Sequence, residues 1–269
     1  MSETPTFKNP PVVEFVLGVQ FSPLTKLSAG HFGLLWKELG DEWGRPEDAP
    51  PITDQFELFE RPKWSHRPGV QLRIDKTMPL GRFVLNHRKQ DRLIQVQSTR
   101  FHLNWRKTGE LKPSYKSLIS EFEDMFAKFQ AFTKAADLGD LELNQWEVTY
   151  VDSFPHDEYW RSPADWSTFL PGLFGNLFSS RGLALEHRAA QWSFEIEPKR
   201  GRLHIAAYPG RWRDEASDSL LIDMTARGPI GRGSVVTLRE GLDLGHEVAV
   251  QSFLSMTSPE VQQRWEKLQ

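Results

Sequence analysis

One long amphipathic helix constrains this chain of 269 residues more than any other feature. Pro113 suits the first turn of a helix, and apolar side chains then recur at three- and four-residue spacing. They form a single stripe: Tyr115, Leu118, Ile119, Phe122, Met125, Phe126 and Phe129. A stripe of this width must be covered by another layer of structure, and the segments before it predict a sheet.

Residues 12–21 alternate between apolar and polar or small side chains, which predicts a half-buried strand. A helix with Ser28 as its N-cap should run to about Trp43, and the Pro- and Asp-rich residues 45–54 predict a loop. Short strands are expected before the long helix, at residues 56–61, 70–74, 82–87 and 93–105.

The same order of elements starts again after residue 137. A strand is expected at 141–154 and a helix opens at Ser162-Pro163. Three strands and a long helix should follow, at 183–197, 202–208, 220–225 and 238–256. The sequence therefore predicts an α+β fold with two similar halves, 1–137 and 138–269, each ordered strand, helix, antiparallel strands, long helix. The halves would join about a pseudo-twofold axis. Chance agreement is the alternative, because no residue-level repeat is visible.

The composition excludes several classes of protein. With no cysteine, the chain has no disulfide, thiolate nucleophile or Cys-ligated metal. A net charge of −3 argues against a protein that coats nucleic acid by charge alone. Neither a secretion signal nor a membrane-spanning run is visible, so a cytoplasmic protein without membrane contact is expected. No cofactor motif is present, and no cofactor is predicted.

Glu195-Ile196-Glu197-Pro198-Lys199 has the Glu-x-Glu-x-Lys spacing of triphosphate tunnel enzymes. Alternating carboxylates on a strand can hold a divalent cation while a lysine contacts a phosphate oxygen. Glu195 and Glu197 are therefore candidate metal ligands, with Lys199 beside them, for metal-dependent triphosphate hydrolysis. An acidic outward strand face that ends at Pro198 is the alternative interpretation.

A second candidate is a basic strand face. On a strand, Arg100, His102 and Arg106 share one face, and Arg88, Lys89 and Arg92 lie shortly before them. Such a face could contact the phosphates of a nucleic acid. A solvated basic face without a ligand is the alternative.

Tryptophan supplies the third candidate. Trp64, Trp160 and Trp212 lie in polar, loop-like contexts, and Arg211 and Arg213 flank the last of them. Exposed tryptophan beside arginine is typical of protein interfaces and their hot spots. Tryptophans that fold back onto the core are the alternative.

Three stretches together carry a resemblance to a known family. They are the start of the chain from Asn9 to Phe21, the strand from Leu93 to Arg106, and the segment from Leu242 to Glu260 with its Leu-Asp-Leu-Gly-His-Glu run. In these the chain resembles a sporadically distributed family of uncharacterised prokaryotic proteins. The resemblance implies no catalytic residues. A patchy distribution implies horizontally moved genes, such as defence, toxin–antitoxin or mobile-element sets.

These observations favour a prokaryotic, cytoplasmic binding module over an enzyme. The expected ligand is a partner protein, with self-association into a homo-oligomer as an alternative, and the expected surface is Trp64, Trp160, Arg211, Trp212 and Arg213. Nucleic-acid binding and triphosphate hydrolysis are the other two hypotheses.

Overall fold

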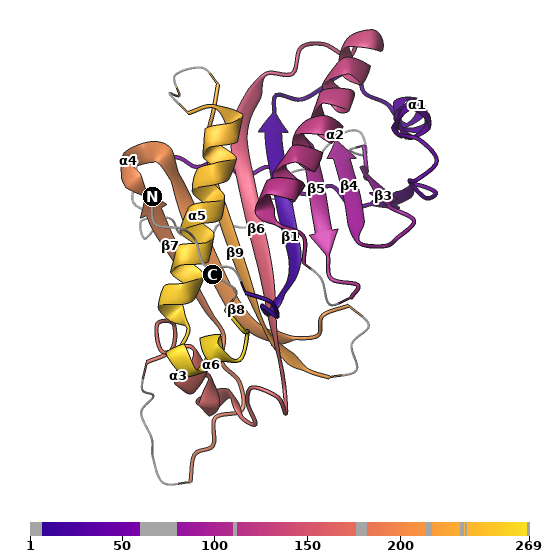
Figure 1. Ribbon diagram of the computed structural model, residues 1–269. Coiled ribbons are helices and arrows are strands. Elements are labelled where there is room, and N and C mark those ends of the chain that lie inside the picture. The colour runs from indigo at the N-terminus through magenta and orange to yellow at the C-terminus, as the bar shows by residue number, and fades with distance from the viewer. Residues whose placement is uncertain are drawn as a thin grey trace.

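The described residues fold around a nine-stranded antiparallel sheet with two long helices on one of its faces (Figure 1). The computed structural model describes residues 7–59, 80–109, 112–175, 182–213, 217–231, 234 and 236–267. The strands are β1 (Val12–Phe21), β2 (Glu47–Ala49), β3 (Arg82–Asn86), β4 (Arg92–Gln97), β5 (Arg100–Arg106), β6 (Leu143–Pro155), β7 (Ala190–Ile196), β8 (Gly201–Gly210) and β9 (Ser219–Pro229). The helices are α1 (Ala29–Leu39), α2 (Tyr115–Ala135), the 3-10 helix η2 (Pro163–Asp165), α3 (Trp166–Phe169), α4 (Glu197–Arg200), α5 (Leu238–Met256) and α6 (Pro259–Gln263). The α+β class is confirmed.

The strand order is β2-β3-β4-β5-β1-β6-β9-β8-β7. Strands β1 and β6 pair antiparallel at the centre, with Leu17 opposite Val148, so residues before and after position 137 build one sheet. Outward from this pair, β5, β4 and β3 follow on one side, and β9, β8 and β7 follow on the other.

Each of the two long helices starts at an N-cap residue whose side chain bonds to the backbone of the first turn. Ser114 accepts a hydrogen bond from the backbone of Ser117 at the start of α2, and Thr237 forms a capping box with Glu240 at the start of α5. The predicted stripe of α2 is buried against β5, where Phe101 stacks on Phe129. Helix α5 covers β6, β9 and β8 on the same face of the sheet (Figure 1).

Trp146 of β6 determines how closely α5 approaches the sheet. Its indole is fully buried, and Gly241 and Gly245 of α5 lie directly against it. A Cβ atom at Gly245 would lie 2.7 Å from Trp146 Cζ3 and 2.9 Å from Val148 Cγ2. The helix therefore packs at a distance that only glycine permits at these two positions.

Several expected elements differ from the structure. Residues 56–59 form no strand, because their backbone groups bond to side chains instead of to a neighbouring strand. The loop expected at 45–54 contains the short edge strand β2, and the strand expected at 183–197 begins only at Ala190. The strand expected at 70–74 lies outside the described residues. No helix in the described part of the chain is long and apolar enough to cross a membrane.

We expect Gly245→Ala to destabilise the fold by about 1–3 kcal/mol, the usual cost of overpacking a core. Helix propensity alone would make Gly245→Ala stabilising, because alanine is favoured over glycine in a helix by about 1 kcal/mol. Destabilisation would therefore report the close packing. Gly33 of α1 is the matched control: nothing lies within 4 Å of its Cβ position, so Gly33→Ala should stabilise the protein slightly. Urea unfolding of both variants measures the difference. Stabilisation by Gly245→Ala would contradict the close approach of α5 to Trp146.

Candidate functional site

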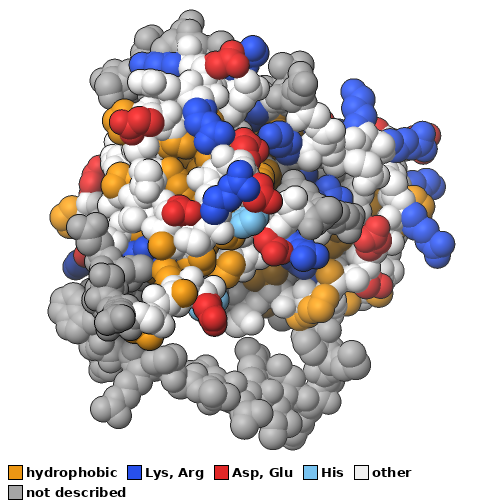
Figure 2. Space-filling view, turned by 90° about the horizontal axis from the view of Figure 1, so that it is seen from below, with side chains coloured by type: hydrophobic (Ala, Val, Ile, Leu, Met, Phe, Trp, Pro, Cys, Tyr) orange, Lys and Arg blue, Asp and Glu red, His pale blue; other side chains and the backbone are white. Residues whose placement is uncertain are grey.

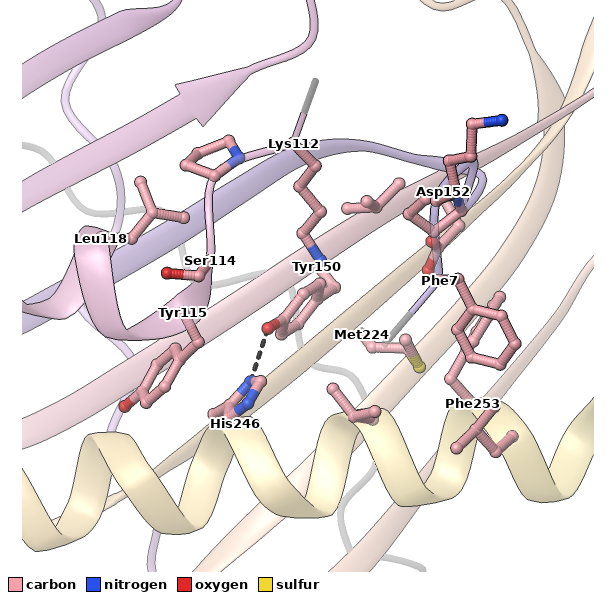
Figure 3. A pocket seen from close by; sticks show the side chains of 16 residues that line it. Phe7, Lys112, Ser114, Tyr115, Leu118, Tyr150, Asp152, Met224, His246 and Phe253 are labelled. Carbon is pink, nitrogen blue, oxygen red and sulfur yellow. Dashed lines mark hydrogen bonds between the residues drawn. The ribbon is translucent and has the colours of Figure 1, made fainter. Parts of the chain in front are cut away.

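A pocket of about 310 Å³ lies between the start of α2, the middle of α5 and the sheet (Figure 3). It is at the small end of the range of ligand pockets. Most of its wall is apolar, and its other residues are the polar or titratable side chains Lys8, Lys112, Ser114, Tyr115, Tyr150, Asp152 and His246. The apolar wall includes Leu118 from α2, Met224 from β9 and Phe253 from α5.

One wall joins α2, β6 and α5 through aromatic side chains. The Tyr150 hydroxyl and His246 Nδ1 are hydrogen-bonded at 2.6 Å, as Figure 3 shows. The His246 ring stacks on Tyr115 with centroids 3.8 Å apart, and the Tyr115 hydroxyl donates to Asp243 Oδ1. Burial, together with the charge of Lys112, lowers the pKa of His246 to about 4. The imidazole is therefore neutral at pH 7.

Arg239 of α5 links the two long helices beside this wall. Its Nε donates to Asp243 at 2.9 Å, and its Nη1 donates to Glu123 of α2 at 3.0 Å. These side chains are about half exposed, so the link contributes little to stability.

Two groups of opposite charge, the buried Asp152 and the half-buried Lys112, lie in the pocket wall. Asp152 is 3% exposed, and its Oδ2 has no hydrogen-bonding partner. Lys112 lies over the Tyr150 ring, with Nζ 5.2 Å from the centroid, and it makes no hydrogen bond or ion pair with the described residues. Such groups are costly to bury in an apolar site unless a partner compensates them.

Burial shifts both pKa values toward neutrality. It raises the pKa of Asp152 to about 7; Lys112 opposes this rise and Asp223 adds to it. It lowers the pKa of Lys112 to about 8, against the attraction of Asp152. Both groups therefore change their charge within a narrow range around neutral pH, as groups in binding and catalytic sites often do.

The alternation of β6 explains why Asp152 faces the pocket. Trp146, Val148, Tyr150 and Asp152 share the face that α5 covers. The sequence signal for the site is thus a carboxylate at a position where the alternation of the strand calls for an apolar residue. Lys112, Asp152 and His246 are therefore site residues that the sequence motifs did not predict.

The predicted tryptophan surface is divided by the structure. Trp64 lies outside the described residues. Trp160 is buried: its Nε1 donates to the Phe154 carbonyl at 2.8 Å and its ring packs edge-on against Trp166. The exposed indole expected at Trp160 is therefore absent, because the loop folds back onto the core.

The remaining three residues of the predicted surface, Arg211, Trp212 and Arg213, are neighbours in the chain. Arg211 and Arg213 are exposed, and the half-buried Trp212 lines a surface depression with Tyr159 and Trp265. Arg211 binds the exposed Asp218 at 2.7 Å. Figure 2 views the molecule from the end where α3 and α6 lie, and basic and acidic side chains are interspersed on that face.

The basic strand face is placed correctly, but it is not solvated. Arg100, His102 and Arg106 of β5 share the sheet face opposite the long helices, as expected. The two arginines form ion pairs, Arg100 with Asp54 and Glu147, and Arg106 with Glu14. His102 lies 3.8 Å from Glu147. Burial lowers the pKa of His102 to about 4, so this residue is neutral.

The remaining basic candidates lie elsewhere. Arg92 pairs with Trp105 in the sheet register, so it lies on the helix-covered face, where it binds Glu121 of α2. Arg88 and Lys89 are exposed in the turn before β4. The six residues therefore do not form one continuous basic surface.

The acidic candidates lie at the edge strand β7. Glu195 accepts a hydrogen bond from the Lys199 backbone, and Glu197 binds Arg200 at 2.8 Å. The strand ends at Ile196, so Glu197 does not continue the alternation that the motif requires. No group of three or more His, Asp and Glu residues suited to a metal ion occurs within the described ranges.

Comparison with known proteins gives no match, either to a family model or to a curated protein. The family resemblance of the three stretches, and the gene sets that it implies, stay predictions.

Asp152 makes stability depend on pH in a definite direction. Its pKa is about 7 in the folded protein and near 4 in an unfolded chain, so the folded state holds the proton more tightly. Stability is therefore lost as the pH rises from about 4 to about 7. We expect Asp152→Asn to match the wild type near pH 4 and to be more stable above pH 7. The gain is a few kcal/mol at most, since one pKa unit is about 1.4 kcal/mol.

Asp165 is the matched control of opposite sign. Backbone hydrogen bonds from Arg161 and Ser162 lower its pKa, so Asp165→Asn should reduce stability once the pH is above the carboxyl's range. Urea unfolding at acidic and alkaline pH compares the two variants. A stability difference for Asp152→Asn that does not grow with pH would contradict the burial of an ionising carboxyl.

Proposed function

We propose that the protein binds a small amphiphile with a carboxylate or similar monoanionic end in the pocket between α2 and α5. The observation that carries this proposal is the buried Asp152, whose Oδ2 has no hydrogen-bonding partner, beside the half-buried Lys112, which makes no hydrogen bond or ion pair with the described residues. A bound polar group would compensate both residues, and the apolar body would contact Leu118, Met224 and Phe253.

The charges favour an anion over a cation. The half-buried Lys112 supplies an ammonium, and the first turn of α2 lines the same pocket with the positive end of its dipole. Asp152 does not oppose an anion once it is protonated, because it then donates a hydrogen bond to it. Its raised pKa makes that protonation accessible near neutral pH.

Octanoate titrated into the full chain by calorimetry tests this proposal. We expect saturable binding to the wild type, weakened about tenfold or more in Lys112→Met, because a hydrogen bond to a charged group is worth about 1.5–3 kcal/mol. The affinity should fall as the pH rises above 7, because Asp152 and Lys112 both lose protons there. Asp152→Asn should remove the part of this dependence that belongs to the carboxyl.

Octylamine, with the same apolar body and opposite charge, is the control ligand. Tighter binding of octylamine than of octanoate would overturn the assignment of an anion. Equal octanoate binding by Lys112→Met and the wild type would remove the pocket as its site. Absence of octanoate binding would overturn the proposal.

A partner protein is the second candidate, and the exposed Arg211 and Arg213 beside Trp212 favour it. A half-buried indole in a surface depression, flanked by arginines, has the composition of a hot spot. Native mass spectrometry of protein purified gently from its host would test this interface. We expect a protein that co-purifies with the wild type to be lost in Trp212→Ala. Phe194→Ala, which removes an exposed ring from edge strand β7, is the control that should retain it. Retention in both variants would contradict this surface.

The internal duplication is also proposed. The strand order about the β1–β6 pair supports it, since β1-β5-β4-β3 and β6-β9-β8-β7 follow the same order outward from the centre. The first half adds the short edge strand β2. Both halves also place a long helix after their last strand, and both helices lie on the same face of the sheet (Figure 1).

A further inference from the structure

Residues 51–59, here called the strap, cross the face of the sheet opposite the two long helices. The strap makes polar contacts with β4, then β5, then β6, β9 and β8 along its length. None of it belongs to a strand. The side chains of the sheet, not its backbone, hold the strap in place.

Glutamine side chains bind the main chain of the strap at two positions. Gln97 Oε1 accepts from the Ile52 N–H at 2.9 Å, and its Nε2 donates to the Ile52 carbonyl at 2.9 Å. Gln145 accepts from the Glu57 N–H at 3.1 Å and donates to the Gln55 carbonyl at 2.6 Å. Contacts of this kind recognise an extended peptide whatever its side chains are.

Two carboxylates of the strap, three residues apart, provide the selective contacts. Asp54 accepts from Thr99 at 2.7 Å and contacts Arg100 at 3.4 Å. Glu57 is buried among three basic groups, which are Arg202 at 2.7 Å, His204 at 2.7 Å and Arg227 at 3.2 Å.

Without the strap, the strands supply too few carboxylates for the buried arginines of this face. Arg100 and Arg227 share one sheet carboxylate, Glu147, at 3.6 and 3.5 Å. The guanidinium of Arg202 is held by the strap, through Glu57 and the Leu58 carbonyl. Three nearly buried arginines therefore need an acidic cover, because an uncompensated buried charge is strongly unfavourable.

The strap is poorly anchored by apolar contacts. Phe56 is 53% exposed and Leu58 is 65% exposed, so these large apolar side chains contribute little burial. The strap is therefore held mainly by polar contacts, and the arginines under it must stay covered by negative charge. A similar acidic segment can replace the strap by making the same polar contacts.

We infer that this sheet face is a binding groove for an extended acidic segment of another protein, and that the strap occupies it as an internal substitute. The ligand would carry two carboxylates three residues apart, one for Thr99 and Arg100 and one for Arg202, His204 and Arg227. This site is separate from the pocket between α2 and α5, which lies on the other face of the sheet.

The contacts favour a peptide over a nucleic acid. Gln97 and Gln145 each pair with both a donor and an acceptor of a peptide main chain, whereas a phosphate backbone offers acceptors only. Glu147, within 4 Å of two of the arginines, would repel a polyanion.

A fluorescently labelled peptide of residues 50–59 tests the inference. The host is the full chain carrying Asp54→Asn and Glu57→Gln, which weakens its own strap, and the control peptide carries the same two substitutions. We expect the acidic peptide to bind this host about tenfold or more tightly than the control peptide, given the size of buried charge-pair effects. The wild type should bind it more weakly than the host, because its strap competes.

Equal binding of the two peptides, or no binding by a host whose unfolding remains cooperative, would overturn the inference. Tighter binding of a single-stranded oligonucleotide than of the acidic peptide would also overturn it.

A second measurement uses the wild type, in case the chain carrying Asp54→Asn and Glu57→Gln does not fold. Excess acidic peptide is added to the wild type, and hydrogen exchange at the amides of Ile52 and Glu57 is followed by mass spectrometry. We expect faster exchange in the strap of the protein when the acidic peptide is present, and no change with the control peptide. Unchanged exchange at increasing peptide concentration would overturn the inference.

Discussion

The packing of Trp146 against the glycines of α5 is the contact on which the site depends. A side chain at Gly241 or Gly245 would push the helix away from β6. His246 follows directly after Gly245, so its bond to Tyr150 and its stack on Tyr115 require this close approach. One tight contact between a strand and a helix thus places residues of three elements around the same pocket.

The two faces of the sheet are stabilised in different ways. The face under α2 and α5 is a close-packed apolar core, in which the buried Asp152 is an exception. The opposite face is a layer of arginines, carboxylates and glutamines, most of whose buried polar atoms find partners in the strap and in one another. Gln20 Oε1 and Arg82 Nε are exceptions without a hydrogen-bonding partner. Apolar packing tolerates few polar groups, whereas a polar layer must satisfy each of them. Each face therefore carries a different kind of candidate site.

The parts of the fold that could be predicted are those in which apolar residues recur with a period. Strand β1, helix α2 and helix α5 are found where the sequence predicts a strand or a helix. Strand β1 is buried on both faces, however, and not on one face as its alternation predicts. The strap has no such signal, since its backbone bonds to side chains of distant strands. The shared face of Arg100, His102 and Arg106 follows from strand geometry alone. Their acidic partners Asp54, Glu147 and Glu14 come from three other segments, so their neutralisation was not predictable from the spacing.

The central position of β1 has a consequence for synthesis. This strand is entirely buried and precedes the other eight described strands in the chain, and its neighbours β5 and β6 follow much later. Contacts so distant in sequence form slowly, because a long loop must close before they can stabilise anything. During that interval both edges of β1 expose unpaired backbone groups beside apolar side chains, a state prone to intermolecular pairing. The nascent chain is therefore open to pairing with other chains at β1 until β5 and β6 have been synthesised.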